Sequence, residues 1–327
     1  MSLFKLAWVQ RGFLVARRCV HNTAIHSSSL RDWSQLHPVA LNYLTFEPSD
    51  GATRATRATR APPDQASAPS KGPIVICHGM LGCAQNWSTL ARLIANRTER
   101  MVLVPDARNH GQSPKLGPIT YPHLAADLRR LCHDLDLNDI TLIGHSLGGR
   151  TAMLLALLES APIKHSCVHP TTRGGIKRMN NFLQALANVD FQAIPDSASF
   201  NQAKAIVDRI LARSMGDQTL RSWLLMNLTQ SSEDEGKFKY SWSFDVHLFE
   251  AHFEKDLVRV PGQEQWVPFG KPTLFLGGAK SNYIPRDGHD LIRRHFPGAV
   301  FDYVADAGHF VHVDNPEEFL RKLVDFL

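Results

Sequence analysis

The 327-residue sequence lacks several features that would each point to a particular class of protein. Its five cysteines are odd in number and include no C-x-x-C pair, which argues against a disulfide framework or a zinc site and favours a reducing compartment. Apolar runs such as "MLLALL" (153–158) are far shorter than the roughly 18 residues that a membrane span needs. We therefore predict no transmembrane helix, no metal and no other cofactor.

Acidic residues are absent from the first 31 positions, where five Lys or Arg residues occur. The whole chain has 36 basic and 31 acidic residues, so these five account for its entire net charge of +5 (36 − 31 = 5). The positive charge thus belongs to a leader and not to a nucleic-acid-binding surface, and we expect no nucleic-acid partner. An Arg-rich, Ser-containing leader without acids is typical of a mitochondrial transit peptide. We predict that residues 1–30 are one and that the protein is mitochondrial, in the matrix; an untargeted tail is the alternative.

A low-complexity segment separates the first expected strand from the rest of the fold. Residues 40–47 alternate as a strand does, whereas residues 49–72 repeat Ala-Thr-Arg three times and are rich in Pro and Ser, which predicts a flexible loop. Short apolar runs then alternate with helical patterns, so that we expect strands at 73–79, 100–108 and 139–146 and helices at 86–97, 121–135 and 148–160. This order predicts an α/β fold with a mostly parallel central sheet and helices on both faces.

The alternation stops in the middle of the chain and then resumes. Residues 176–260 carry mostly helical spacing, including the run "DQTLRSWLLMNLT", and we predict a helical cap insertion over the site. Strands at 271–278 and 299–305 and a last helix at 315–327 restore the earlier order. The folded domain is therefore predicted to span residues 34–327, and its apolar cap suggests a hydrophobic acyl substrate.

A nucleophile motif follows the third of these strands. "GHSLG" (144–148) is G-x-S-x-G between the apolar run "ITLI" and a helical pattern, which is the context of a nucleophile elbow. Gly144 and Gly148 leave room for a sharp turn that exposes the hydroxyl of Ser146. Because a helix begins there, its free backbone N–H groups and its positive end face the charge that develops on the substrate. We predict Ser146 as the nucleophile.

Two further motifs supply the partners that such a serine needs. "HGMLG" (78–82) follows the first buried strand, and its turn can direct the backbone N–H of Met80 toward the site. Together with the N–H of Leu147, this would form an oxyanion hole. "DAGHF" (306–310) follows the last strand, which makes His309 the predicted general base, since the order nucleophile–acid–histidine requires a late histidine.

The loop "PDARNHGQSP" (105–114) follows another strand end. Asp106, Arg108 and Ser113 can tie this loop together through charge-assisted hydrogen bonds, and we interpret them as structural. His110 comes too early in the chain to be the base.

Taken together, these segments resemble a known family. "HGMLGCAQNW", "DARNHGQSP", "GHSLGGRTAM", "WLLMNL", "TLFLGGAKSNYI" and "AGHFVH" are similar to the α/β-hydrolase superfamily, and more narrowly to the mitochondrial abhydrolase domain-containing protein 11 family of serine esterases. The resemblance spans about residues 34–327. It implies an α/β-hydrolase fold, Ser146 as nucleophile, His309 as base and a small-molecule acyl or lipid ester as substrate. Fungal relatives of this family are ethanol acetyltransferases, which leaves alcohol acyl transfer as an alternative.

One expected residue is missing, the acid of the catalytic triad. In the family that this sequence resembles, the triad acid is the Asp of a V-D-x-x-P stretch at the end of the strand after the nucleophile helix. Here no Asp or Glu occurs between Glu159 and Asp190. The corresponding segment, "IKHSCVHPTT" (163–172), is also shorter than that of the family. The other position used in the superfamily, after "TLFLGG", is Ser281. Asp287 is a weak candidate because it fits the start of a helix at 287–295 equally well, and Asp190 and Asp306 are weaker.

The missing acid has two consequences. Without it, turnover is expected to fall by a factor on the order of 10⁴, while the oxyanion hole leaves residual catalysis. A shortened strand in the middle of the sheet would leave backbone groups unpaired. The chain is thus predicted to be a serine ester hydrolase of reduced activity, with a catalytically impaired binding protein as the alternative.

Overall fold

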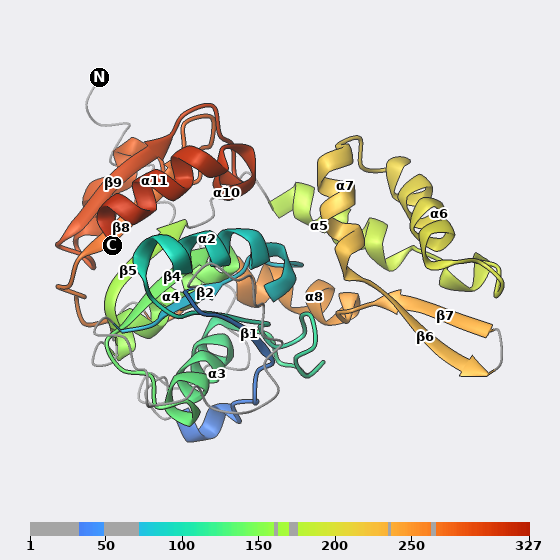
Figure 1. Cartoon of the computed structure of the whole chain (residues 1–327), viewed down its shortest axis with the longest axis horizontal. Coiled ribbons are helices and arrows are strands. Elements are labelled where there is room, and N and C mark those ends of the chain that lie inside the picture. The colour runs from blue at the N-terminus through green and yellow to red at the C-terminus, as the bar shows by residue number, and fades with distance from the viewer. Residues whose placement is uncertain (1–32, 49–71, 160–162, 170–175, 235–236, 263–265) are drawn as a thin grey trace, which may run out of the picture.

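The computed structural model describes residues 33–48, 72–159, 163–169, 176–234, 237–262 and 266–327 (Figure 1). The predicted transit peptide and nearly all of the predicted loop at 49–72 lie outside these residues. Among the described residues, no helix is both long and apolar enough to cross a membrane.

A seven-stranded sheet runs through the molecule in the order β1-β3-β2-β4-β5-β8-β9. The edge strand β1 pairs antiparallel with β3, and every other pairing is parallel. The strands are β1 Tyr43–Phe46, β2 Ile74–Cys77, β3 Val102–Pro105, β4 Ile140–His145, β5 Ile163–His169, β8 Thr273–Gly278 and β9 Ala299–Val304. The predicted mostly parallel sheet is confirmed.

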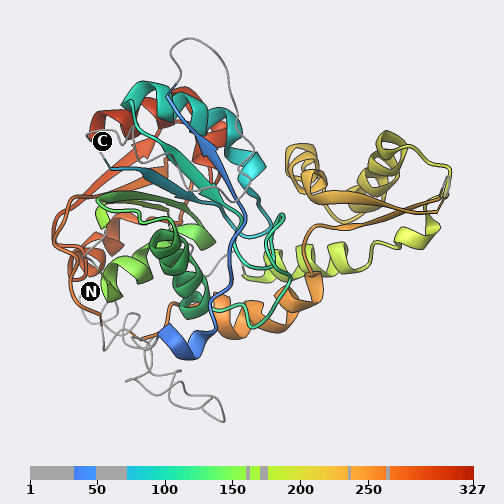
Figure 2. The same cartoon turned by 60° about the horizontal axis from the view of Figure 1, so that its bottom comes forward.

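Helices cover both faces of this sheet, as Figure 2 shows. In β2, Ile74 and Ile76 pack in the cluster formed with α2 (Ser88–Thr98) and α11 (Pro316–Phe326), whereas Val75 and Cys77 pack on the side of α3 (Tyr121–Asp134) and α4 (Leu147–Leu158). Successive strand residues point to opposite faces, so a strand buried on both sides reads as an unbroken apolar run. Shorter helices complete the domain: η3 Trp33–Leu36, η5 Ala84–Trp87, η11 Arg286–Gly288, α9 His289–Arg293 and α10 Val311–Asp314.

The short segment after the nucleophile helix still forms a central strand. β5 pairs with β4 from Ile140↔Ile163 to His145↔His169, with one irregularity between Ile140 and Thr141. On its other side it pairs with β8 over three residues. The expected gap in the backbone ladder is therefore not found at β5.

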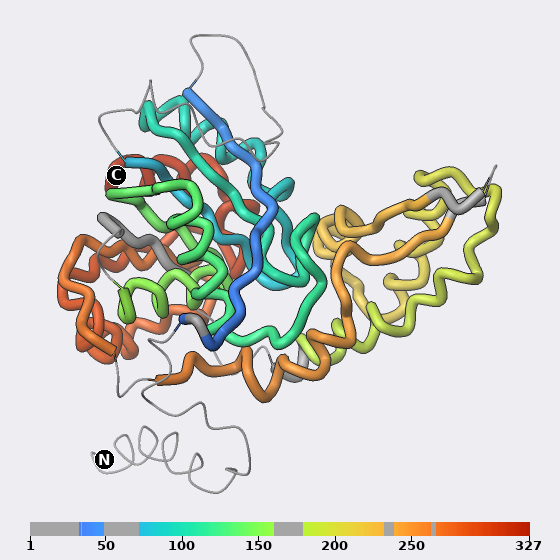
Figure 3. Tube along the Cα trace, turned by 90° about the horizontal axis from the view of Figure 1, so that it is seen from below, coloured from blue at the N-terminus to red at the C-terminus, as the bar shows by residue number. Residues whose placement is uncertain are grey.

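The described residues between β5 and β8 form the cap, most of which projects beside the sheet as a lobe (Figures 1 and 3). Its last helical part lies against α3 and α4, where the Leu257 carbonyl accepts from Tyr121 and Arg150. Its elements are α5 Ile176–Ala187, η7 Phe191–Ala193, α6 Phe200–Ala212, α7 Gln218–Leu224, η8 Leu225–Asn227, β6 Leu228–Asp234, β7 Lys237–Trp242, α8 Val246–His252 and the π-helix η9 Phe253–Leu257. Its interior includes Trp242, which stacks on Phe244 with ring centroids 5.7 Å apart and donates from its indole to the Leu186 carbonyl.

The cap departs from prediction where its hairpin begins. Helical spacing in "DQTLRSWLLMNLT" (217–229) predicted a helix, but α7 and η8 end at Asn227 and the chain continues as β6, paired with β7. The side-chain amide of Asn227 donates to the Leu224 carbonyl, which satisfies a helix-terminal acceptor and ends the helix. The apolar pattern alone did not reveal this capping contact.

Candidate active site

Ser146 occupies a strained turn between β4 and α4. Its backbone angles are φ 53° and ψ −112°, and it is the residue immediately before the first turn of α4. A Cβ atom on Gly148 would lie 2.2 Å from the Cys77 carbonyl oxygen, and one on Gly144 would lie 2.5 Å from the Gly148 carbonyl oxygen. Both positions therefore need glycine so that the start of α4 can approach β4 and β2 closely, which leaves the half-buried Ser146 at the end of the sheet.

The predicted oxyanion turn lies beside this serine. Gly82 N–H donates to the Gly79 carbonyl at 3.0 Å, which closes a tight turn around Met80 and Leu81. A Cβ built on Gly79 would lie 3.5 Å from Cβ of Ser146 and 2.8 Å from the ring of His145. Leu147 is the first residue of α4, where backbone N–H groups have no partner within the helix. The structure thus brings Ser146, Met80 and Leu147 together.

His309 lies in the loop between β9 and α10 and is joined to the elbow through its backbone. Nε2 of His145 lies 3.0 Å from the His309 carbonyl oxygen, and the two rings are 4.8 Å apart. Burial lowers the pKa of His145 to about 4, so its ring is neutral near pH 7 and carries its proton on Nε2 to donate this bond. The loop that carries the predicted base is in this way held against His145, the residue before the predicted nucleophile.

Tyr283 forms a second contact with the base, which the sequence did not predict. Its ring stacks on that of His309, with centroids 3.9 Å apart and planes 21° from parallel. Tyr283 belongs to the loop after β8, in which Ser281 Oγ accepts a hydrogen bond from the Tyr283 N–H at 3.2 Å. Ser281, at the position where the superfamily places an acid, therefore lies in a loop packed against His309.

The three weak candidates for the missing acid have other roles in the structure. Asp190 caps η7 in the cap lobe by accepting from the Gln192 N–H at 3.0 Å. Asp306 is 86% exposed and pairs with Lys280 at 2.9 Å. Asp287 is exposed in η11, where its charge acts on His289. Positions 170–175, "PTTRGG", lie outside the described residues and contain no carboxylate.

The loop "PDARNHGQSP" forms hydrogen bonds to the segment that contains the oxyanion turn. Asp106 accepts from the Ala84 N–H at 2.7 Å and the Gln112 N–H at 2.9 Å, and the Ser113 hydroxyl donates to the Asp106 carbonyl at 2.6 Å. Arg108 forms a buried, bidentate ion pair with Asp127 of α3 at 2.6 and 2.7 Å. Asp106 and Ser113 thus tie the loop together as the sequence predicted, and Arg108 joins it to α3.

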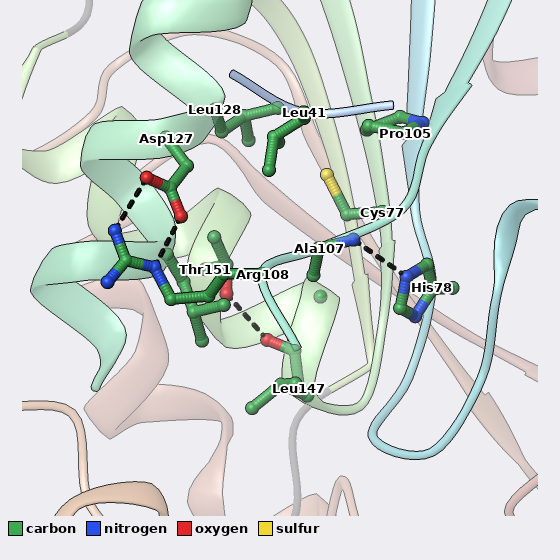
Figure 4. Close-up of a pocket in the computed structure, with 12 residues that line it drawn as sticks. Leu41, Cys77, His78, Pro105, Ala107, Arg108, Asp127, Leu128, Leu147 and Thr151 are labelled. Atoms are coloured by element: carbon green, nitrogen blue, oxygen red, sulfur yellow. Dashed lines mark hydrogen bonds and ion pairs between the residues drawn. The ribbon is translucent and has the colours of Figure 1, made fainter. Parts of the chain in front are cut away.

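Figure 4 shows a small pocket behind the elbow. Its lining is mostly apolar and includes Cys77, Leu128, Leu147 and Gly148, with the Arg108–Asp127 pair at one side, while neither Ser146 nor His309 is among its lining residues. Burial raises the pKa of the Cys77 thiol, which keeps it protonated and unreactive at neutral pH. We therefore assign this pocket to the packing of the elbow and not to the substrate.

Comparison with known proteins agrees with this geometry. Residues 72–316 match the family model described as "alpha/beta hydrolase fold". The chain belongs to the α/β-hydrolase family. It is 34% identical over 283 residues to a Xenopus laevis protein named "sn-1-specific diacylglycerol lipase ABHD11". The alignment covers 85% of this chain and 87% of that protein.

Two further similarities bear on activity and fold. The chain is 28% identical over 278 residues to "Ethanol acetyltransferase 1" of Cyberlindnera fabianii, covering 79% of this chain and 80% of the relative. Among solved structures, "Marine microorganism esterase" superimposes with a TM-score of 0.73 at 25% identity, covering 88% of this chain and all of that one. The fold and family that the sequence motifs implied are confirmed.

Proposed function

We propose that Ser146 is the nucleophile of a carboxylic ester hydrolase, with His309 as general base and the N–H groups of Met80 and Leu147 as the oxyanion hole. Ester hydrolysis is the activity that the names of the lipase and esterase relatives have in common. The observation that carries the residue assignment is the positive-φ elbow at Ser146, flanked by the turn at Met80 and tied to the backbone of His309.

The proposed reaction has two half-steps. His309 accepts the proton of the Ser146 hydroxyl as its oxygen attacks the ester carbonyl, and the tetrahedral oxyanion is held by the two N–H groups. The imidazolium then donates its proton to the leaving alcohol, which leaves an acyl-enzyme. A water molecule, activated by His309, resolves this intermediate to the free acid.

The substrate we propose is an ester with a hydrophobic acyl group, and a glycerolipid ester is the class that the named lipase relative supports. Trp223 of α7 lies 5.6 Å from Phe310, the residue after the proposed base, so an aromatic surface of the cap lies next to the reacting groups. Met226 follows Trp223 by three residues and lies in η8. Its side chain is 47% exposed and adds apolar surface at the base of the cap.

Labelling with a fluorophosphonate probe tests the assignment of the nucleophile. The wild-type protein is expected to take up the label, and Ser146→Ala is expected to lose it while keeping the same thermal midpoint. If a folded wild-type protein takes up no label, the proposal of an activated serine is wrong, and the catalytically impaired binding protein becomes the better description.

Alcohol acyl transfer is the second candidate function, and it is supported by the acetyltransferase relative. The same acyl-enzyme would be resolved by an alcohol in place of water. Product analysis with an activated acyl ester and added ethanol distinguishes the two, because an ethyl ester forms only by transfer.

We also propose that the protein acts in the mitochondrial matrix. The support is the composition of residues 1–31, which hold five basic and no acidic residues. Import into isolated mitochondria, followed by mass determination of the protected product, tests this. A protein that stays outside, or that keeps its full mass after import, contradicts the predicted transit peptide.

A further inference from the structure

The oxyanion turn contains a residue in an unfavourable backbone conformation. Leu81 has φ +62° and is only 2% exposed, although leucine rarely adopts positive φ. Such a conformation persists where surrounding groups hold it in place, and it is often found at functional sites. The neighbours of Leu81 therefore decide how the turn presents the N–H of Met80.

Two buried side chains hold the two peptide groups on either side of Leu81. The Leu81 N–H donates to Nε2 of His110 at 3.1 Å, and the Leu81 carbonyl accepts from Nδ2 of Asn227 at 2.9 Å. His110 Nδ1 lies 2.9 Å from the Arg108 carbonyl oxygen, to which it donates, so Nε2 remains the acceptor. Burial lowers the pKa of His110 well below its usual value, which keeps the ring in this neutral form.

The peptide group that carries the Met80 N–H is fixed from its other end. The Gly79 carbonyl accepts from the Gly82 N–H at 3.0 Å and from His78 Nδ1 at 2.8 Å. Because C=O and N–H of one trans peptide point in opposite directions, the two donors that hold the Gly79 oxygen also set the direction of the Met80 N–H. The Leu81 N–H, occupied by His110, is not available to a substrate oxygen.

Asn227 differs from the other residues that hold the turn because it belongs to the cap. It ends η8. Its side-chain oxygen accepts from Ser243 Oγ at 3.1 Å, and its backbone carbonyl accepts from the Ser243 N–H at 2.7 Å. Asn227 and Ser243 thus close the base of the β6–β7 hairpin. The same side chain joins this base to the oxyanion turn, and it is 1% exposed.

We propose that Asn227 is a positioning residue that holds the oxyanion turn through Leu81, so that transition-state stabilisation depends on this hydrogen bond from the base of the cap. This inference rests on the proposed function, because it requires the Met80 N–H to bind the oxyanion. It assigns the cap a part in the chemical step in addition to substrate binding.

A matched control is available at a second junction between cap and sheet domain. Asn109 donates to the Asp245 carbonyl at 2.9 Å and accepts from the Asp245 N–H at 2.8 Å, but it does not bond to Leu81. Its φ of +60° suits glycine, so Asn109→Gly removes two hydrogen bonds to the cap without backbone strain. It loosens the cap and leaves the contact of Asn227 with Leu81 in place.

The test compares Asn227→Asp with Asn109→Gly on a short p-nitrophenyl ester. Asn227→Asp keeps the shape of the side chain but removes the donor to Leu81. We expect its kcat to fall about 10-fold or more with KM within about twofold, since a fully lost oxyanion donor costs about 10² to 10³ in kcat. We expect Asn109→Gly to change mainly KM and the thermal midpoint. Asn227→Ala, which introduces no charge, is made in parallel and is expected to lower kcat in the same way.

Each outcome bears on one of the two proposals. Equal losses of kcat in the Asn227 variants and in Asn109→Gly, or a wild-type kcat in a folded Asn227 variant, would overturn the positioning role while Ser146→Ala remains inactive. Full hydrolysis by Ser146→Ala would instead overturn the proposed function itself. If Asn227→Asp does not fold, the kcat of folded Asn227→Ala decides.

Discussion

A carboxylate introduced at position 281 is expected to raise the activity of this protein. Ser281 stands where the superfamily places a triad acid after β8, and its loop already packs against the base through Tyr283, 3.9 Å from the ring of His309. Ser281 Oγ accepts a hydrogen bond from the Tyr283 N–H at 3.2 Å, and an Asp side chain can accept the same bond. We therefore expect Ser281→Asp to fold and to bring a negative charge toward His309.

The size of the effect follows from what the acid does. A full triad acid contributes on the order of 10⁴ in turnover, about 5 to 6 kcal/mol, by orienting the histidine and stabilising its charged form. The face of Tyr283 already lies against that ring, and a cation–π contact of this kind contributes about 0.5 to 2 kcal/mol. The remaining 3 to 5.5 kcal/mol, by difference, sets the expected gain in kcat at roughly 10² to 10⁴.

The assay is hydrolysis of a p-nitrophenyl ester by wild type, Ser281→Asp and Ser281→Asn. The Asn variant has the shape of Asp without its charge, so a gain that depends on a carboxylate appears only in the Asp variant. Equal rates for the two variants, in proteins with unchanged thermal midpoints, would refute the reasoning that a carboxylate at position 281 stabilises the charged form of His309.

Three further predictions test the framework around the site. Arg108→Leu is expected to lower the free energy of unfolding by about 3 to 5 kcal/mol because it leaves the Asp127 carboxylate buried and unpaired, and urea denaturation should show most of this recovered in the double variant with Asp127→Leu. Tyr283→Ala is expected to lower kcat about 2- to 30-fold, because it removes the ring that stacks on His309, whereas Tyr283→Phe is expected to keep most of the wild-type kcat. Equal losses of kcat in both variants would contradict a role for the aromatic face at position 283. Burial lowers the pKa of His145 to about 4, below its unfolded value near 6.5, so the stability that this residue contributes is complete above pH 6.5 and decreases as pH falls toward 4. Its share of the stability lost between pH 7.5 and pH 5 is about 2 kcal/mol, and denaturation at the two pH values should show a loss smaller by about this amount in His145→Asn.

The parts of the fold that the sequence predicted correctly are those governed by local pattern. Unbroken apolar runs such as "PIVIC" and "ITLI" predicted buried strands, because a strand covered on both faces needs apolar residues at every position. Gly144 and Gly148 predicted the sharp elbow, and the clashes that a Cβ would make at both positions give the physical reason. The order of these elements was sufficient for the fold class.

What the sequence did not predict depends on contacts between distant segments. Tyr283 lies 26 positions before His309 in the chain, and nothing in "KSNYIP" indicates that its ring stacks on the base. The apolar pattern places Asn227 within a helix, whereas in the structure Asn227 is the last residue of η8. Its side chain donates a hydrogen bond to the Leu81 carbonyl, 146 positions away in the chain. Single polar or aromatic residues carry no periodicity, so only the folded chain reveals such partners.

The missing acid, too, is a single residue and not part of a periodic pattern. A catalytic carboxylate is one residue on a loop, and its position in the sequence changes easily while the sheet around it is kept. Here β5 pairs on both sides although its segment is short and holds no carboxylate, so the strand is maintained by backbone hydrogen bonds, which depend little on side-chain identity. His309 in turn is held by contacts that need no acid, its carbonyl to His145 and its ring to Tyr283. Orientation of the base is therefore largely independent of the carboxylate, whereas stabilisation of its charged form is not, and this is why the expected defect is in rate and not in the assembly of the site.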